Sequence, residues 1–341
     1  MKIHSFFKES ILSCLSKSGF IDFMYYKNRQ NITVLMIHGV MTKNENVSWV
    51  PLRSQLQLDE LQRILTILSE FYQFITIDQC ADILEEKIAF VDHALLITFD
   101  DGYRNNIDYA LPICERFGIK PIIFVATDHI YSGLPFWFDR LDYALQQIMG
   151  TTITLEYKGK SYYFDATSRQ ALKASYKKFR DNCKGLFTDD IEMNRLFDAL
   201  SQMLEERSGK ALSDICLEDD WSAIATWPQL RTAVKNGRLD VGSHTVNHWR
   251  IDRLSKKHVL SQLQQSKKSI EQELLIQCDY FCYPNGDYNN SVIKLLEKSG
   301  YRAAFSTNVG KCNSKDNLMT LKRFNFPGNR TKNEILYLLN R

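Results

Sequence analysis

Residues 94–103 read ALLITFDDGY, an apolar run that ends in two adjacent carboxylates. The run predicts a buried strand, and carboxylates at its end do not belong in a core, so we expect Asp100 and Asp101 to face a pocket. Side chains alternate along a strand, but Gly102 allows the backbone to turn at once. Both carboxylates can then converge on the space beyond the strand.

Two histidines far downstream are the best partners for this negative charge. Residues 242–248 read GSHTVNH, and His244 and His248 would share one face if a helical turn begins there. One carboxylate with two imidazoles is a ligand set typical of a divalent metal ion.

The composition predicts a soluble globular enzyme. The 341 residues are 44% hydrophobic, which is enough for a large core in one large or two small domains. A formal net charge of +3 is too weak and too dispersed to indicate a nucleic-acid partner. The apolar runs, such as 121–126, are far shorter than the roughly 20 residues that span a bilayer, so we expect no transmembrane helix.

The first 30 residues form a separate amphipathic segment in this interpretation. They contain neither a long apolar stretch nor a small-residue cleavage site, so no secretory signal is expected and a cytoplasmic location is the default. Ile3, Phe7, Ile11 and Leu15 recur at helical spacing. A helix docked on its own domain is favoured, and peripheral contact with a membrane surface is the alternative. The eight cysteines match no disulfide framework or zinc finger, and we expect most of them to be buried apolar residues.

Short apolar segments alternate with helical ones along the rest of the chain, residues 31–341. Seven or eight such units favour a distorted (β/α)7-type barrel, an α/β fold, in which the strand carboxyl ends and the following loops carry the chemistry. The expected strands are 32–37, 74–77, 94–99, 121–126, 239–242, 280–283, 303–306 and 321–326. The expected helices are 59–71, 79–86, 104–117, 255–275 and 288–299.

The stretch from about 136 to 226 interrupts this alternation. It offers a helical segment, a hairpin around 157–160 and long polar helices, so we interpret it as a mainly helical insertion. A cap beside the active site and a purely structural appendage are about equally favoured.

Two motifs resemble those of the metal-dependent polysaccharide deacetylases, a carbohydrate esterase family with a NodB-like homology domain that removes acetyl groups from sugars. The family's Thr-Phe-Asp-Asp-Gly is found at 98–102 and its Ser-His-x-x-x-His at 243–248. The resemblance implies Asp100 as general base and Asp101, His244 and His248 as metal ligands. It covers roughly residues 34–125 and 227–326 and leaves the insertion out.

The third family motif departs from its common form, Arg-x-Pro-Tyr-Gly. Residues 282–286 read CYPNG, which is similar to the Tyr-Pro-x-Gly version of one branch. That resemblance implies that the tight turn aims the backbone N–H of Asn285 at the developing oxyanion. Arg323, at the end of a predicted strand, is our hypothetical replacement for the missing arginine.

The family's late Leu-x-His motif, which supplies the general acid, is absent, since no histidine follows His258. Residues 35–40, LMIHGV, resemble the opening strand of a permuted branch in which that histidine precedes the aspartates. This resemblance implies His38 as general acid. His4, His93 and His129 have no such support and are treated as structural.

These residue types suit amide or ester hydrolysis. An ion held by two imidazoles and one carboxylate keeps coordination positions open, activates water and polarises a carbonyl. Zinc is the ion favoured by a mixed His and Asp set, with manganese, cobalt and nickel as alternatives.

Three functions stay open at this point. The leading one is a deacetylase acting on an N-acetylated sugar in a polysaccharide, oligosaccharide or surface-glycan precursor. The others are a metal-dependent amidase or imidase on a small nitrogenous compound, and a catalytically silent glycan-binding protein. Four aromatic residues near predicted strand ends could stack on sugar rings or pack in the core: Trp137, Phe138, Trp227 and Trp249. The sequence does not determine the oligomeric state.

Overall fold

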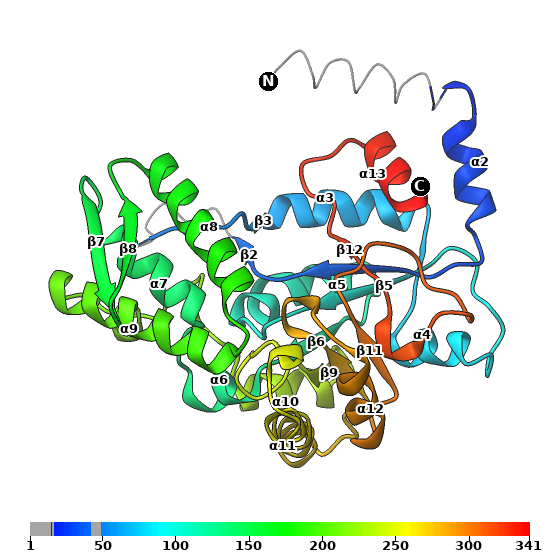
Figure 1. The fold of residues 1–341 in the computed structure, drawn as a ribbon. Helices are drawn as coiled ribbons and strands as arrows, with labels where there is room; N and C mark the ends of the chain where they lie inside the picture. Colours follow the sequence, from blue (N-terminus) through cyan, green and yellow to red (C-terminus); the bar gives the residue numbers. More distant parts are fainter. Residues whose placement is uncertain (1–14, 16, 42–48) are drawn as a thin grey trace.

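Parallel strands occupy the centre of the molecule, and helices surround them (Figure 1). The computed structural model describes residues 15, 17–41 and 49–341. The central strands are β1 (Thr33–Ile37), β4 (Gln73–Phe74), β5 (Ala94–Phe99), β6 (Ile122–Val125), β9 (Asp240–Ser243), β10 (Tyr280–Cys282), β11 (Ala303–Phe305) and β12 (Phe324–Asn325). They lie in the order β11-β10-β9-β6-β5-β1-β12, with β4 beside β5, and every pairing among them is parallel.

A narrow seam closes this sheet into a barrel. Phe305 in β11 forms a parallel bridge with Leu321, just before β12. The Leu321 N–H donates to the carbonyl of Ala304 and its carbonyl accepts from the N–H of Ser306, both at 2.9 Å. The distorted (β/α)7-type barrel predicted from the sequence is therefore confirmed.

Strands β1, β5, β6, β10 and β11 are buried on both faces, as expected for parallel strands covered by helices. Along β5, Leu95, Ile97 and Phe99 join the large apolar cluster that also contains the surrounding helices, whereas Leu96 joins a second cluster with Val34, Phe124, Cys282 and Phe305 from other strands. Thr98 and Asp100 continue the face of Leu96, because side chains alternate along a strand. The alternation therefore directs Asp100 to the inside of the barrel at its carboxyl end.

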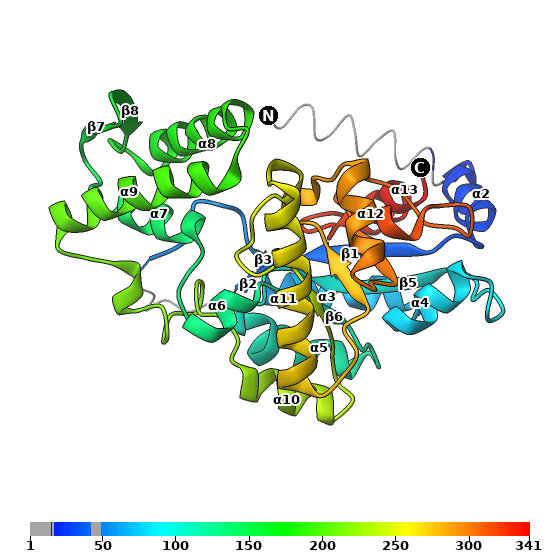
Figure 2. The same cartoon turned by 60° about the horizontal axis from the view of Figure 1, so that its bottom comes forward.

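The helices around the barrel are α3 (Leu58–Ser69), α4 (Ile77–Leu84), α5 (Leu111–Arg116), α6 (Thr127–Ser132), α10 (Trp227–Lys235), α11 (Lys256–Leu274), α12 (Asn290–Lys298) and α13 (Lys332–Asn340). Figure 2 shows α11 running across the molecule in front of the strands. The chain also forms short helical turns at 106–110, 212–214, 251–253, 284–286 and 318–320. A small separate sheet pairs β2 (Val40–Met41) with β3 (Leu56–Gln57).

Two expected elements differ from the structure. The strand predicted at 74–77 ends at Phe74, because the Thr76 hydroxyl and Gln79 amide form a capping box that begins α4 at Ile77. The helix predicted at 104–117 consists of a π-helical turn, Asn106–Ala110, that continues into α5. The other predicted strands and helices are present with shifted ends.

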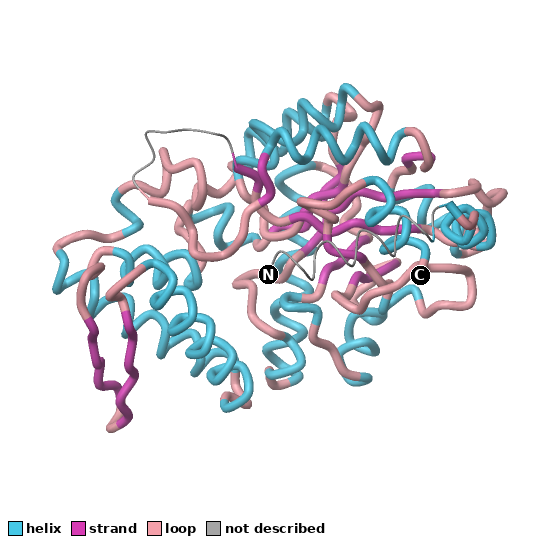
Figure 3. The backbone as a smooth tube through the Cα atoms, turned by 90° about the horizontal axis from the view of Figure 1, so that it is seen from above, coloured by secondary structure: helices cyan, strands magenta, loops and turns pink. Residues whose placement is uncertain are grey.

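Within the expected insertion of about 136–226, residues 137–208 form a lobe beside the barrel (Figures 1 and 3). Their elements are α7 (Trp137–Gln146), the antiparallel pair β7 (Thr152–Tyr157) and β8 (Lys160–Asp165), α8 (Arg169–Leu186) and α9 (Asp190–Ser208). The predicted hairpin at 157–160 is confirmed. Leu141, Phe164, Phe197 and other buried residues give this lobe an apolar cluster of its own, to which Leu52 also belongs.

At the amino-terminal side, α2 (Phe20–Lys27) lies next to the barrel. The Asn28 side chain donates to the carbonyl of Asn340 at 2.8 Å, and Tyr25 stacks on His93 with ring centroids 3.7 Å apart. His4, Ile3, Phe7 and Ile11 lie outside the described residues, and so does most of the amphipathic pattern. No helix in the described part of the chain is long and apolar enough to cross a membrane. The described cysteines are free and buried, as expected.

Candidate metal centre and its cavity

A cavity of about 510 Å³ opens at the carboxyl ends of the barrel strands. The loops after β1, β5, β9 and β10 contribute His38, the two aspartates, the two histidines and Asn285. Helices α7, α8 and α9 of the inserted lobe contribute the opposite wall. The structure thus brings together residues that are up to about 250 positions apart in the sequence, because parallel strands end at the same edge.

Asp101, His244 and His248 form a compact group in which one ligand atom from each residue lies within 4.8 Å of the others. The Asp101 Oδ1 atom is 3.3 Å from His248 Nε2 and 3.6 Å from His244 Nε2. Two ligands of a tetrahedral zinc ion with bonds of roughly 2.0–2.2 Å lie about 3.4 Å apart. These separations therefore suit a shared divalent ion.

Two further observations fit a metal ion at this place. Asp101 Oδ2 is buried and has no hydrogen-bond partner among the described residues. His244 Nδ1 lies 2.8 Å from the carbonyl of Cys282, to which it donates, so its Nε2 lone pair faces Asp101. Burial, and then the neighbouring His248, lower the pKa of His244 to about 4. The imidazole is therefore neutral at physiological pH, which is the form that binds metals.

The two aspartates diverge within a single tight turn. Asp101 adopts a φ of 79° and Gly102 a φ of 94°. The sequence predicted a turn at Gly102, but the backbone already turns at Asp101. A Cβ atom at Gly102 would approach Val125 and Ile130 to 3.2 Å. Glycine is thus required by both its backbone conformation and the space around it.

The histidine loop is irregular, and the helical turn considered for residues 244–248 is not formed. Thr245 and His248 have φ values of 69° and 58°, which interrupt any helical path. Gln262 of α11 holds the loop, because its Oε1 accepts from the N–H groups of Val246 and Asn247 at 2.9 and 3.1 Å. The imidazoles therefore converge through strained backbone rather than helical spacing.

Asp100 is held by Arg323, and both side chains are buried. The guanidinium donates from Nη1 to Oδ1 and from Nη2 to Oδ2, each at 2.8 Å, and also contacts Thr98 and the carbonyl of Ser306. Burial raises the pKa of Asp100, but the charge and hydrogen bonds of Arg323 outweigh it and lower the pKa below its usual value. Arg323 contacts Asp100 on the side away from the cavity, which it does not line.

His38 and Asn285 both line the cavity. His38 Nε2 is 4.0 Å from Asp100 Oδ2, and its side chain is 46% exposed, so it can exchange protons with solvent. Asn285 adopts a φ of 60° in the turn after β10, and its side-chain oxygen accepts from Lys184 of α8.

An aromatic wall from the inserted lobe packs against the metal ligands. Phe136 and Phe138 stack with ring centroids 5.1 Å apart, and they meet the His248 ring at 5.2 and 5.7 Å. Of the four aromatics considered for sugar stacking, Trp137 and Phe138 line this cavity, whereas Trp227 and Trp249 are not among its described lining residues. His129 and His93, interpreted as structural, lie in aromatic contacts outside the metal group.

Several charged residues near the site escaped the sequence analysis. Arg53 pairs with buried Asp139 at 3.0 Å, donates to the Tyr103 hydroxyl at 2.6 Å and lies over the Phe138 ring. Burial raises the pKa of Asp139 to about 7 despite this pairing. Because these residues come from a loop and from the insertion, no strand-end pattern identifies them.

Arg250, two residues after His248, also escaped notice. Its Nε donates to Asp190 Oδ1 at 2.6 Å and its backbone N–H to Asp190 Oδ2 at 2.8 Å. Asp190 begins α9, so this buried ion pair ties the inserted lobe to the histidine loop.

Comparison with known proteins gives a consistent result. The family model "Polysaccharide deacetylase" matches residues 176–304, which include both histidines and the 282–286 turn but neither aspartate. The match begins within α8, in the segment that the motif resemblance leaves out. YxkH of Bacillus subtilis (strain 168), whose own assignment as a polysaccharide deacetylase is provisional, is 28% identical over 98 residues. That region is 29% of this chain and 35% of YxkH, about a third of either protein.

Solved structures share the fold over most of the chain. The deacetylase PplD of Streptococcus pyogenes, solved in complex with acetate, aligns with a TM-score of 0.59 and 16% identity over 91% of this chain and 98% of its own. IcaB of Ammonifex degensii aligns with a TM-score of 0.57 and 14% identity over 92% and 98%. The de-N-acetylase of Aggregatibacter actinomycetemcomitans aligns with a TM-score of 0.52 and 14% identity over 91% and 100%. Residues 176–304 are thus similar in sequence to the polysaccharide deacetylases, and the chain shares the barrel fold of the solved deacetylases over most of its length.

Proposed function

We propose that this protein is a metal-dependent deacetylase that hydrolyses the acetyl group of an N-acetylated sugar. The observation that carries the proposal is the convergence of Asp101, His244 and His248, with one buried Asp101 oxygen left unpartnered, beside the ionised Asp100. The polysaccharide deacetylase match supports an acetylated carbohydrate as the substrate class.

Asp101, His244 and His248 would hold the ion, and zinc suits this ligand set best. When bound, a divalent ion supplies a polarising charge for the acetyl carbonyl and activates a water molecule at neutral pH. The Cys282 carbonyl fixes the tautomer of His244, and the rings of Phe136 and Phe138 restrict solvent near His248.

Asp100 is the proposed general base. Arg323 keeps the carboxylate ionised and fixes its plane, so that an oxygen lone pair is ready to accept the proton of the attacking water. Since Arg323 touches Asp100 and not the cavity, we assign it a positioning role.

His38 is the proposed general acid for the departing amine. Its place at the end of β1, facing the cavity and partly exposed, allows it to recover a proton from solvent after each turnover. The Asn285 backbone N–H is the proposed oxyanion donor, a contribution of about 3 kcal/mol in other hydrolases.

The decisive experiment combines metal analysis of the purified protein with acetate detection over N-acetylhexosamine conjugates, cyclic imides and ureides. We expect about one equivalent of divalent metal per chain and acetate from acetylated sugars, with loss of turnover in Asp100→Asn. Hydrolysis of the imides alone would favour an amidase. Glycan binding with no rate change in Asp100→Asn would indicate a silent binding protein.

A surface-glycan precursor as substrate and a cytoplasmic location are parts of the same proposal. Cell fractionation with an antibody against the native protein tests the location, and recovery in the extracellular fraction would contradict it.

A further inference from the structure

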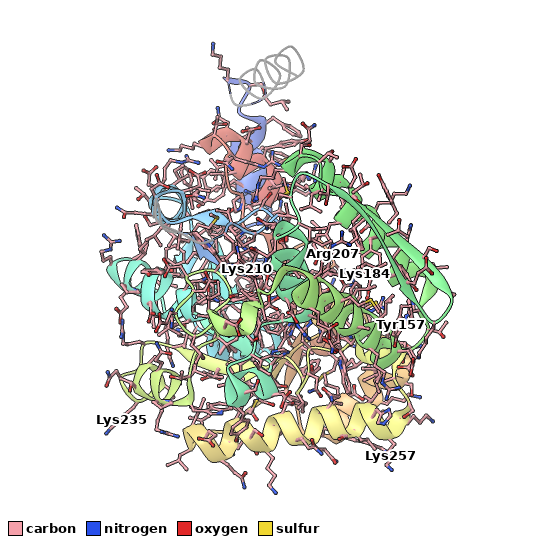
Figure 4. The ribbon with its side chains drawn as sticks, turned by 90° about the vertical axis from the view of Figure 1, so that its left-hand side faces the viewer. Tyr157, Lys184, Arg207, Lys210, Lys235 and Lys257 are labelled. Atoms are coloured by element: carbon pink, nitrogen blue, oxygen red, sulfur yellow. The ribbon has the colours of Figure 1, made fainter. Side chains whose placement is uncertain are left out.

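Two cations of the inserted lobe line the candidate active-site cavity together. Arg180 and Lys184 lie one helical turn apart on α8, so their side chains are neighbours on one face of the helix. Both are half-buried. In Figure 4, Lys184 lies over the middle of the molecule, whereas Lys235 and Lys257 lie at its outline.

The other two basic residues of the cavity wall already have carboxylate partners. Arg53 pairs with Asp139 at 3.0 Å and Arg250 with Asp190 at 2.6 Å. By contrast, no ion pair within the described part of the chain includes Arg180 or Lys184. Asp181 and Asp287 act electrostatically on Lys184, and Asp181 also on Arg180, but neither carboxylate forms an ion pair with these cations. The cavity wall therefore carries two positive charges that no ion pair among the described residues neutralises.

Two aromatic rings flank Arg180 in the cavity wall. Its guanidinium lies 5.8 Å from the Trp137 ring centroid and 5.6 Å from that of Tyr176. Its Nε is buried and has no hydrogen-bond partner among the described residues. These aromatic contacts use none of the guanidinium N–H donors, which stay available for a planar or tetrahedral oxyanion.

Lys184 is in a similar position. Its ammonium donates to the side-chain oxygen of Asn285, an amide dipole that does not neutralise a charge. Burial, and then the charges of Arg180 and Arg250, outweigh the opposing charges of Asp287 and Asp181 and lower the pKa of Lys184 to about 8. Like charges four residues apart on a helix repel each other, so this arrangement is unfavourable in the free protein. A bound anion would relieve the repulsion.

We propose that Arg180 and Lys184 form a phosphate subsite, and that the sugar substrate carries a phosphate or diphosphate ester. This inference rests on the proposed deacetylase function and adds the chemical class of its substrate. One cavity holds both the metal group and the two cations, so one ligand can contact both. A phosphate ester matches two adjacent cations better than a carboxylate, because it offers three acceptor oxygens and up to two negative charges.

The test compares the binding of glucose 1-phosphate and methyl glucoside by calorimetry, at several salt concentrations. Neither compound carries an acetyl group, so the result does not depend on deacetylation. We expect glucose 1-phosphate to bind at least about 10-fold more tightly, with a preference that weakens as salt rises.

The variants assign this preference to the two cations. Arg180→Met with Lys184→Met should bring the two affinities to within about 2-fold. The charge-preserving pair Arg180→Lys with Lys184→Arg should retain the preference for phosphate. Lys173→Met, an exposed position of the same helix, is the matched control and should behave as the wild type. Thermal melting of each variant confirms folding.

Equal affinities in the wild type would overturn the proposal. So would a phosphate preference that survives in the double Met variant, because the phosphate would then bind elsewhere, such as at the metal centre. The affinities of uridine diphosphate glucose and of a short polyprenyl diphosphate glucose in micelles are then compared. Tighter binding of the first indicates a nucleotide-linked substrate, and tighter binding of the second a lipid-linked one. Acetate release fails or succeeds independently of these affinities, so the two proposals can be separated.

Discussion

The barrel end and the inserted lobe meet at one cavity, but they hold their polar side chains differently. On the barrel side, Asp100 has Arg323 behind it and His244 has the carbonyl of Cys282. On the lobe side, Arg180 and Lys184 lie against aromatic rings and an amide, and neither forms an ion pair with a described carboxylate. The difference is that the polar side chains of the barrel are held by fixed protein partners, whereas the two cations of the lobe are left open to a ligand, as the proposed phosphate subsite requires.

The sharpest test of the barrel side is removal of a metal ligand. Asp101→Asn should abolish stable metal binding and lower acetate release at least about 100-fold, because even the loss of a residue that only orients a ligand costs 10–100-fold. Metal analysis and acetate release measure the two effects. The matched control is Asp108→Asn, an exposed position after the same turn. If Asp101→Asn keeps its full metal content, Asp101 is not a metal ligand.

The support behind Asp100 is the next target. Arg323→Met leaves a buried carboxylate without its partner and should lower the free energy of unfolding by about 3–5 kcal/mol. Urea unfolding measures this loss. The double variant Asp100→Asn, Arg323→Met should recover much of the stability, since no buried charge is then left unpaired. A double variant no more stable than Arg323→Met would contradict this account.

On the lobe side, stability should depend on pH through Asp142 of α7. Burial raises the pKa of Asp142 to about 6, even though its oxygens accept from Leu52 N–H and Gln146 at 2.7 Å. Because the folded protein favours the protonated carboxyl, the stabilising contribution of Asp142 is complete below about pH 4. It is lost as the pH rises through about 6 and the buried carboxyl ionises. The wild type should lose about 3 kcal/mol relative to Asp142→Asn between these values. Urea unfolding from pH 4 to 7.5 checks the sign, and a flat difference would contradict it.

The smallest expected effect concerns the loop between the two regions. Gln262→Ala removes the acceptor that holds Val246 and Asn247, and should weaken metal affinity about 10–100-fold while the ligands remain. Competition with a chelator measures the affinity. Gln265→Ala, exposed on the same helix, is the control and should leave the affinity unchanged.

The predictable parts of the fold were those with a strong local pattern. The continuous apolar runs of β1, β5 and β6 indicated strands buried on both faces, and the side chains at their carboxyl ends indicated the site. The capping box of Thr76 and Gln79 can be recognised in the sequence, and it predicts that the strand ends before Thr76.

Other features had no comparable signal. The positive φ values of Asp101, Thr245, His248 and Asn285, four of nine such non-glycine residues in the described chain, depend on tertiary contacts such as those of Gln262. Two ion pairs join loops of the barrel to the lobe: Arg53 with Asp139, and Arg250 with Asp190. Contacts of this kind form only when segments distant in the sequence meet, so the local spacing of residues does not predict them.

The seam at Phe305 and Leu321 has a consequence for how the protein would fail on heating. Arg323 follows the seam directly and donates to the carbonyl of Ser306 on its other side. Fraying of these few backbone bonds would release the guanidinium from Asp100 while the remaining strands stay paired. Loss of the contact between Arg323 and Asp100 would then precede global melting, and amide exchange at Leu321 and Ser306 would report how long this contact lasts.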